Sequence, residues 1–304
     1  MRFVGWTFCV LVFWIALAIP VSAQISSPQS VRLTMPISVT TPRGIVFDLQ
    51  AADFRILIDK QPCSVQTVSH ADIELAVGFV FDTTRSMQMR YPENGLRQAI
   101  SAFMDNSDAR NEYFVMEINE SPRLLQDFTR DRNAVLAAVP QDRKGETDLY
   151  GGLAFALRKI QESPNRKALV VFSDGYDNKS KTKFEEMTRA SAASDVMLVA
   201  VVEDPSLMSQ KARSNTYLTP TNSEFVRYVE LLGGLFVPVL SARADLNRIT
   251  SGFADAAASL RQLYWTECEM AAPKSGWHDV KTEIIKPGLR NVTIAARQKT
   301  YRKK

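Results

Sequence analysis

The stretch IELAVGFVFDTTRS, residues 73–86, decides the fold of this chain. Its first nine residues are almost continuously apolar, and the sequence then changes abruptly to polar side chains. A run of this length is typical of a strand covered on both faces, as in a parallel sheet. Two further runs, residues 168–172 and 196–202, have the same character and also end in polar loops.

Segments with helical periodicity separate these runs. Their apolar residues recur every three or four positions, which gives each helix one buried stripe. Alternating strands and helices predict an α/β fold with a doubly wound, mainly parallel sheet. One hairpin interrupts the alternation, with predicted strands at residues 113–118 and 123–128. The stripes are Leu96, Ile100, Phe103 and Met104; Leu149, Leu153, Ala156, Leu157 and Ile160; and Leu246, Ile249, Phe253 and Leu260.

Both ends of the chain have the pattern of β structure. Residues 31–68 and 263–295 alternate short apolar stretches with turn formers. We expect the two ends to pair into one small β-sandwich in which the α/β domain is inserted; separate edge strands are the alternative. The expected division is a signal peptide at 1–23, an N-terminal β segment at 24–70, the α/β domain at 71–261, and a C-terminal β segment at 262–304.

The first residues have the features of an export signal. Arg2 precedes an apolar run from Phe3 to Ile19, and the small residues Val21, Ser22 and Ala23 follow it closely. This pattern predicts cleavage before Gln24 and an exported protein, periplasmic or secreted. The alternative is an uncleaved membrane anchor, for which the run is short.

Cysteine usage agrees with export. Cleavage would remove Cys9 and leave Cys63 and Cys268 in a compartment that permits disulfides. We expect these two to bond, and two separate buried thiols are the alternative. In the loop-entropy model a ring of this size contributes about 5 kcal/mol.

Charge excludes one class of partner. The chain has 37 Lys and Arg against 33 Asp and Glu, and these residues are interspersed, so nucleic-acid binding has no support. The densest basic run is at the C-terminus and is predicted to be a solvated tail. Its members are Arg297, Lys299, Arg302, Lys303 and Lys304.

Three polar clusters occupy the positions where a parallel sheet binds its ligands, at the carboxyl ends of strands. They are residues 82–86 after the first run, 145–150 at the start of a helix, and 173–175 after the second run. Carboxylates and hydroxyls without histidine or cysteine are hard donors that suit Mg²⁺, with Mn²⁺ or Ca²⁺ as substitutes. Each cluster alone could instead cap the helix that follows it.

These clusters resemble the metal-ion-dependent adhesion site of the von Willebrand factor type A domain, with its pattern Asp-x-Ser-x-Ser, a distant Thr and a distant Asp. Asp82, Thr84, Ser86, Thr147 and Asp174 fill the five positions in order, with Thr84 in place of the first Ser. The resemblance implies that Thr84 and Ser86 contact the metal directly, that Thr147 joins in some states, and that Asp82 and Asp174 act partly through water. It also implies a protein partner that supplies an acidic side chain to the open position.

Residues 147–150 and 171–178 resemble in particular a group of secreted bacterial proteins of this family, as do the closing motifs around Trp277 and Pro287. Members of the family can couple binding to movement of a C-terminal helix, here residues 245–260. We interpret Asp148 as a first-turn acid favoured by the helix dipole, and Asp177 and Asn178 as turn residues; a role as metal ligands is the alternative for each. Residues 203–223 carry no assignable feature and are either a partner-facing loop or a mobile connection.

Other function classes have weaker support. A haloacid-dehalogenase-type phosphatase would use Asp82 as nucleophile with Mg²⁺, but Thr84 stands where such enzymes place a general acid. A serine hydrolase would need a nearby histidine, and the two in the chain, His70 and His278, lie in the predicted β segments. A scaffold with a vestigial metal site is a third alternative. We therefore predict a protein-binding module and not an enzyme, with membrane contact only if the N-terminal segment stays uncleaved.

Overall fold

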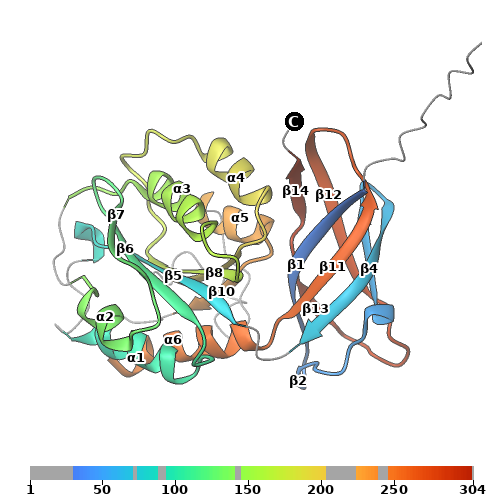
Figure 1. The fold of residues 1–304 in the computed structure, drawn as a ribbon, viewed down its shortest axis with the longest axis horizontal. Coiled ribbons are helices and arrows are strands. Elements are labelled where there is room, and N and C mark those ends of the chain that lie inside the picture. Colours follow the sequence, from blue (N-terminus) through green and yellow to red (C-terminus); the bar gives the residue numbers. More distant parts are fainter. Residues whose placement is uncertain are drawn as a thin grey trace, which may run out of the picture.

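The computed structural model describes residues 30–70, 74–87, 94–140, 145–202, 224–238 and 246–302. Figure 1 shows two parts side by side, an α/β domain and a domain made of strands, which we call the β-domain. The predicted signal peptide and the 203–223 segment lie outside the described residues. Within those residues, no helix combines the length and the apolar character needed to span a membrane.

The α/β domain contains a six-stranded sheet in the order β10-β9-β8-β5-β6-β7. All neighbours are parallel except the edge strand β7, which pairs antiparallel with β6, as the predicted hairpin requires. The prediction of a mainly parallel α/β sheet is confirmed. The strands are β5 (Leu75–Asp82), β6 (Glu112–Ile118), β7 (Arg123–Thr129), β8 (Arg166–Ser173), β9 (Met197–Val202) and β10 (Leu235–Pro238).

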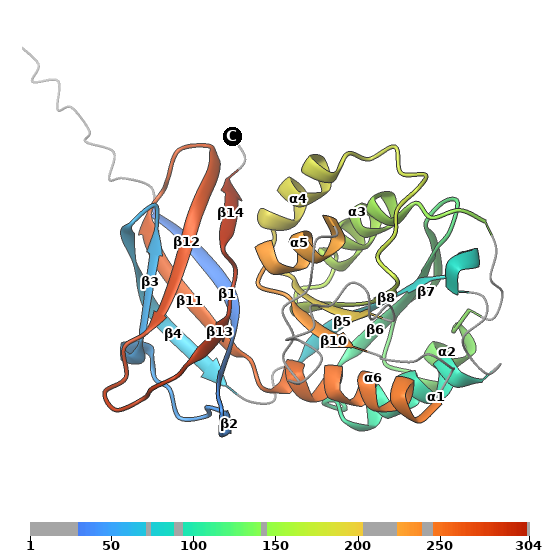
Figure 2. The same cartoon turned by 180° about the vertical axis from the view of Figure 1, so that it is seen from behind.

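Helices cover both faces of this sheet. One face packs against α1 and α6, and the other against α3, α4 and α5, as the view from behind also shows (Figure 2). The helices are α1 (Gly95–Asp105), α2 (Arg132–Ala137), α3 (Leu149–Ile160), α4 (Phe184–Ala192), α5 (Glu224–Leu231) and α6 (Leu246–Arg261), with short 3₁₀ turns η1 (Ala51–Asp53) and η2 (Arg85–Met87).

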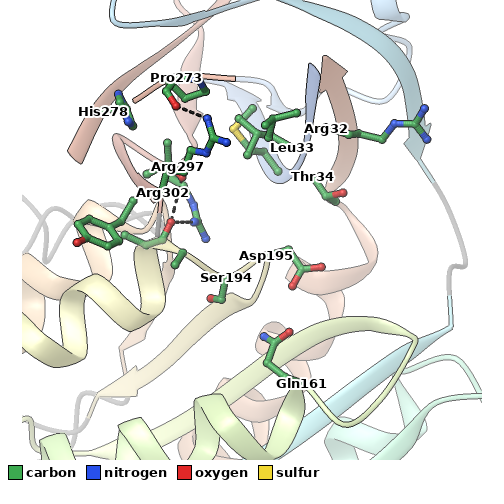
Figure 3. A pocket seen from close by; sticks show the side chains of 16 residues that line it. Arg32, Leu33, Thr34, Gln161, Ser194, Asp195, Pro273, His278, Arg297 and Arg302 are labelled. Carbon is green, nitrogen blue, oxygen red and sulfur yellow. Dashed lines mark hydrogen bonds between the residues drawn. The ribbon is translucent and has the colours of Figure 1, made fainter. Parts of the chain in front are cut away.

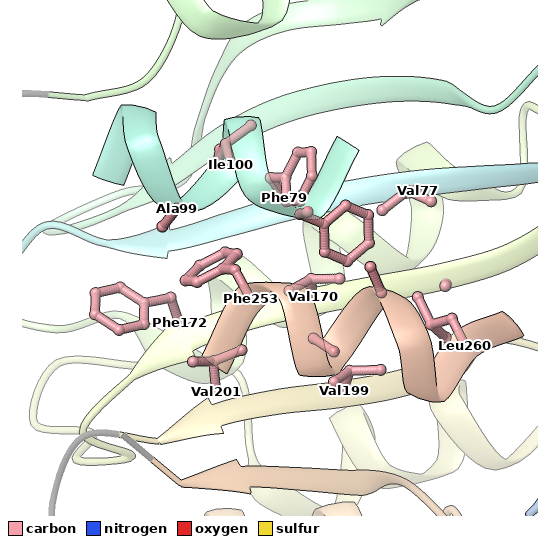
Figure 4. Packing of buried hydrophobic residues seen from close by; sticks show 14 of the residues in the cluster. Val77, Phe79, Ala99, Ile100, Val170, Phe172, Val199, Val201, Phe253 and Leu260 are labelled. Atoms are coloured by element: carbon pink, nitrogen blue, oxygen red, sulfur yellow. The ribbon is translucent and has the colours of Figure 1, made fainter. Parts of the chain in front are cut away.

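Strand β5 lies at the centre of the sheet, and all of its residues are buried. Its alternate side chains divide between the two faces. Phe79 packs toward α1 and α6 (Figure 4), as does Phe81, while Val80 packs toward α3. A Cβ atom at Gly78 would lie 2.2 Å from the ring of Phe114. Glycine at this position therefore lets the ring of Phe114, from the neighbouring strand β6, pack directly against the backbone of β5.

The β-domain joins the two ends of the chain. Its strands follow one hydrogen-bonded order, β13-β1-β11-β4-β3-β12-β14, with β2 paired to β1. N-terminal β1 and β4 flank C-terminal β11, so the expected pairing of the two ends is observed. The strands are β1 (Ser30–Thr41), β2 (Gly44–Ile45), β3 (Phe54–Ile58), β4 (Gln61–His70), β11 (Tyr264–Ala271), β12 (Gly276–Ile284), β13 (Thr293–Ala295) and β14 (Lys299–Arg302).

This single strand order does not confirm the expected division into two packed sheets, and the sandwich stays a prediction. Two successive strands of the C-terminal segment lie at opposite ends of this strand order: β13 pairs with β1 at one end, and β14 pairs with β12 at the other. The segment from β13 to β14 thus supplies both edge strands of the β-domain.

The predicted disulfide is confirmed. Cys63 in β4 is bonded to Cys268 in β11, with the Cα atoms 5.4 Å apart, and both residues are buried. The two cysteines are 205 residues apart in sequence, and their strands flank the α/β domain in the chain.

The C-terminal segment also fixes the β-domain to the α/β domain. Arg297 Nη1 and Thr300 Oγ1 both donate hydrogen bonds to the carbonyl oxygen of Ala192, at 2.8 and 3.0 Å. Arg297 is only 5% exposed, so the prediction of a solvated basic tail is wrong for this residue. The reason is that β14 packs against α4, which places Arg297 just before it against the Ala192 carbonyl, whereas Lys299 stays exposed and pairs with Asp279; Lys303 and Lys304 lie outside the described residues.

Candidate functional site

The first polar loop begins where β5 ends, at Asp82, which is 1% exposed. Its Oδ1 accepts hydrogen bonds from the backbone N–H of Thr84 at 3.0 Å and from Thr84 Oγ1 at 2.6 Å. Its Oδ2 accepts a hydrogen bond of 2.7 Å from the hydroxyl of Ser173 in β8. The carboxylate therefore binds its own loop with one oxygen and the neighbouring strand with the other.

Ser173 was not predicted as a site residue. It is fully buried, and its hydroxyl accepts a hydrogen bond of 2.9 Å from the N–H of Gly175 while donating to Asp82. The pairing of Phe81 with Phe172 places the next residue of each strand, Asp82 and Ser173, side by side. Ser173 could have been predicted as a site residue only if the pairing register between β5 and β8 had been known.

Asp174 lies beside this pair. It is 3% exposed, and its Oδ1 accepts a hydrogen bond of 3.2 Å from the N–H of Tyr176. The pKa of Asp82 is raised to about 6, chiefly because the carboxylate is buried and in smaller part by the negative charge of Asp174, while hydrogen bonds from Thr84 and Ser173 lower it. No Lys or Arg of the described residues forms an ion pair with either carboxylate. The site therefore concentrates negative charge in a place with little water.

The cluster at residues 145–150 reaches the same edge of the sheet through Thr147, which is 3% exposed. The N–H of Thr147 donates to Asn178 Oδ1 at 2.8 Å, and its carbonyl oxygen accepts from the N–H groups of Asn178 and Lys179. The Arg85 N–H donates to the carbonyl of Gly145 at 3.5 Å, which joins this loop to the one after β5. The three predicted clusters are thus brought together.

The comparisons with known proteins agree with this geometry. Residues 77–176 match the family model of the von Willebrand factor type A domain. The α/β domain is a von Willebrand factor type A (vWA) domain. No curated protein sequence matches the chain.

Solved structures resemble the chain more weakly. The PilB minor pilin from Streptococcus sanguinis is 14% identical with a TM-score of 0.45, over 64% of this chain and 63% of that one. A von Willebrand factor type A protein from Catenulispora acidiphila is 12% identical with a TM-score of 0.47, over 90% of this chain and 74% of that one. The chain therefore spans less than two thirds of the pilin's length, and the assignment to the family rests on the family model.

Polar side chains after β8 hold the start of α3 in the vWA domain. Asp148 is the N-cap of α3, since its Oδ1 accepts from the Gly151 N–H at 3.1 Å. Asp177 Oδ1 accepts from the Leu149 N–H at 2.8 Å, and the Ser180 hydroxyl contacts both carboxylates. Asp148 thus serves the helix start, as the N-cap and not in the first turn where the sequence analysis placed it, and the side chains of Asp177 and Asn178 bind backbone N–H groups near that start.

The donors at this edge of the vWA domain suit a hard divalent cation. Asp82, Thr84, Thr147 and Asp174 offer two carboxylates and two hydroxyls, all nine-tenths or more buried. Ser86 lies in η2, directly after this loop, but its side chain is outside the described set. Within that set, no group of three or more His, Cys, Asp or Glu side chains gathers as a metal cage, so hydroxyls must contribute to any binding here.

The two histidines lie outside the vWA domain, as the sequence indicated. His70 ends β4, and His278 lies in β12 with Nδ1 bonded to Asp59 Oδ2 and Nε2 bonded to the carbonyl of Lys274, each at 2.7 Å. Neither belongs to the elements that carry the three polar loops, so no serine–histidine pair is formed there.

Proposed function

We propose that this vWA domain is a metal-ion-dependent protein-binding module of an exported protein. Asp82, Thr84, Ser86, Thr147 and Asp174 would hold one Mg²⁺, with Mn²⁺ or Ca²⁺ as possible replacements. The bound ion would supply positive charge and an open coordination position, which an acidic side chain of a protein partner would fill. Domains of this family are commonly protein-interaction modules.

One observation carries this proposal. Asp82 is 1% exposed and lies beside the charge of Asp174, yet no basic side chain of the described residues pairs with it. Burying carboxylates without a compensating charge is costly. A divalent cation would remove that cost. Because several of the proposed donors are uncharged hydroxyls, they would neutralise the cation only in part, and the bound ion could still attract a further carboxylate.

The surrounding hydrogen bonds support binding and not catalysis. Both oxygens of Asp82 already accept hydrogen bonds, from Thr84 and from Ser173. Those hydroxyls fix the direction of the carboxylate, which favours a preformed metal site. The residue two positions after Asp82 is a threonine, and its hydroxyl cannot act as the general acid that a phosphatase needs.

We also propose the setting of this module. The limits are residues 71–261 for the vWA domain, inserted between the β segments 24–70 and 262–304, which would form the β-sandwich. A disulfide across those segments supports an oxidising compartment and hence export, periplasmic or secreted, with the signal peptide at 1–23 removed. The membrane is involved only if that segment stays uncleaved, and nucleic acid is not a partner.

Isothermal titration with Mg²⁺ and Mn²⁺ tests the metal site. We expect saturable binding by the chelator-treated protein, loss of binding in Asp82→Ala and Asp174→Ala, and unchanged binding in Asp48→Ala, a matched carboxylate loss on the β-domain surface. Circular dichroism checks that the variants fold. Unfolding of both site variants would indicate structural caps, and absence of binding by the unaltered protein would favour the vestigial scaffold.

A peptide library displayed on phage tests the partner. Peptides retained in Mg²⁺ and released by EDTA should contain an essential Asp or Glu. Replacing that residue by Asn or Gln should abolish retention, and Asp82→Ala protein should retain none of them. Retention that is indifferent to EDTA would contradict a metal-mediated contact.

A further inference from the structure

A cavity of about 470 Å³ lies between the vWA domain and the β-domain. This volume is in the range of small-molecule sites, roughly 300–1,000 Å³. Strand β1 supplies one wall through residues 31–35, the end of α4 supplies another through residues 192–195, and the segment around β14 supplies a third. Figure 3 shows labelled side chains from all three walls around this space.

Arg297 is the unusual member of the lining. It is 5% exposed, and Nη1 donates to the Ala192 carbonyl, but Nε and Nη2 are buried and have no hydrogen-bond partner. These two nitrogens form one edge of the guanidinium, the edge that binds a carboxylate with two parallel hydrogen bonds. Unsatisfied donors on a buried cation are costly, so an incoming anion would gain from pairing with them.

The other charges of the lining are also mainly positive. Arg302 and Arg32 belong to it, and its only carboxylate is Asp195, which lies 3.6 Å from Lys167. Both ring nitrogens of His278 are already hydrogen bonded, so this residue does not compete for a ligand. Burial lowers the pKa of Arg297 to about 10, opposed by Asp195 and Tyr228, and Arg297 therefore remains charged at neutral pH.

The rest of the lining is suited to an organic body. Leu33 and Met35 from β1 and Pro273 after β11 present apolar surface, while Thr300 and Ser194 add hydroxyls. Inorganic anions have no apolar part to place there. A ligand that carries both a carboxylate and a hydrocarbon portion would use both kinds of surface.

We propose that this interdomain cavity binds a small organic acid, whose carboxylate pairs with the Nε and Nη2 edge of Arg297 and whose apolar part contacts Leu33, Met35 and Pro273. The wall covers both nitrogens, so side chains around them move when the carboxylate enters. The site is separate from the metal loops and does not depend on the proposed metal-dependent binding.

Titration calorimetry with 3-phenylpropanoate, its uncharged amide and inorganic phosphate tests this proposal, at equal ionic strength and without divalent metal. We expect saturable binding of the acid, with the amide and phosphate each at least tenfold weaker. Asp82→Ala should bind the acid as the unaltered protein does, which separates this site from the metal site. Equal binding of acid and amide, tighter binding of phosphate, or no saturable binding of the acid would overturn the proposal.

Variants place the ligand in the cavity. Arg297→Gln should weaken binding of the acid at least tenfold, but it also removes a hydrogen bond to Ala192. Two further variants do not alter Arg297: Arg302→Gln, which removes a second guanidinium from the lining, should weaken binding several-fold, and Thr34→Trp should fill the space and abolish it. Arg55→Gln in β3, where Arg55 pairs with Glu283, is the matched control and should change nothing. Unaltered binding in both Arg302→Gln and Thr34→Trp would overturn the assignment.

Discussion

The hydroxyl of Ser173 donates a hydrogen bond of 2.7 Å to the carboxylate of Asp82, from one buried strand to the next. The same hydroxyl accepts from the N–H of Gly175, at the turn that presents Asp174. One small side chain therefore fixes the direction of one proposed ligand and the backbone next to another. Groups that orient metal ligands commonly change metal affinity when they are removed.

Ser173→Ala should weaken Mg²⁺ binding about 10- to 100-fold while the fold is retained. The reason is that Asp82 Oδ2 loses its donor and the Gly175 N–H loses its acceptor. Titration calorimetry measures the affinity, and Ser64→Ala, an exposed serine of β4, is the control. Equal affinities in Ser173→Ala and the unaltered protein would show that this bond does not orient the site.

The pH dependence of stability should reveal His70. Burial lowers its pKa, its ring contacts those of Tyr264 and Phe47, and Nε2 is buried without a partner. Below about pH 6.5 the unfolded state binds more protons at this residue than the folded state does, so the free energy of unfolding falls as the pH falls.

The variant His70→Phe keeps a ring at this position and removes the titration. Urea unfolding between about pH 5 and pH 8 should therefore show a flatter pH dependence for His70→Phe than for the unaltered protein. The two proteins should differ least at the alkaline end, where His70 is neutral in both states. Parallel curves would exclude His70 as a source of the dependence.

The disulfide should matter for stability and not for the metal site. Cys63→Ala/Cys268→Ala should lower the free energy of unfolding by about 2–5 kcal/mol, because the unfolded chain is no longer cross-linked. Mg²⁺ affinity should stay within twofold, since none of the proposed ligands belongs to β4 or β11. Urea unfolding and calorimetry measure the two quantities, and an unchanged unfolding midpoint would contradict the first expectation.

Much of the vWA domain was predictable because its central strands are buried on both faces. Apolar runs such as residues 73–81 are recognisable without knowledge of their neighbours. Shorter elements were not assigned from sequence, among them α4 and the four-residue β10, because their apolar residues are too few in a row to give a clear period. At the N-terminus, where the sequence indicated only short apolar stretches, residues 30–41 form the single long strand β1.

The candidate site was predictable only where its residues follow the strands directly. Asp82 and Asp174 stand at strand ends, and their positions are visible in the sequence. Ser173 was missed because its role depends on which strand lies beside β5. Arg297 was read as part of a solvated tail because its partner, the Ala192 carbonyl, is 105 residues away and belongs to the other domain. Such long-range contacts leave no local pattern.

Asn178 offers a test of whether the loop after β8 positions Thr147. Its side chain accepts from the Thr147 N–H at 2.8 Å, and its N–H donates to the Thr147 carbonyl at 3.2 Å. Asn178→Ala removes only the side-chain contact and leaves the part-buried Thr147 N–H without that acceptor. We expect this loss to cost about 1 kcal/mol of stability.

The same change should weaken Mg²⁺ binding about tenfold, because Thr147 would no longer be held at the edge of the sheet. Asn106→Ala is the matched control: it removes an asparagine side chain that donates to the Ala102 carbonyl at the end of α1, outside the three polar clusters. If both variants lose similar stability but only Asn178→Ala loses affinity, Thr147 belongs to the metal site. Unchanged affinity in Asn178→Ala, with the same loss of stability, would instead mean that the loop after β8 supports the fold alone and that the metal is held without Thr147.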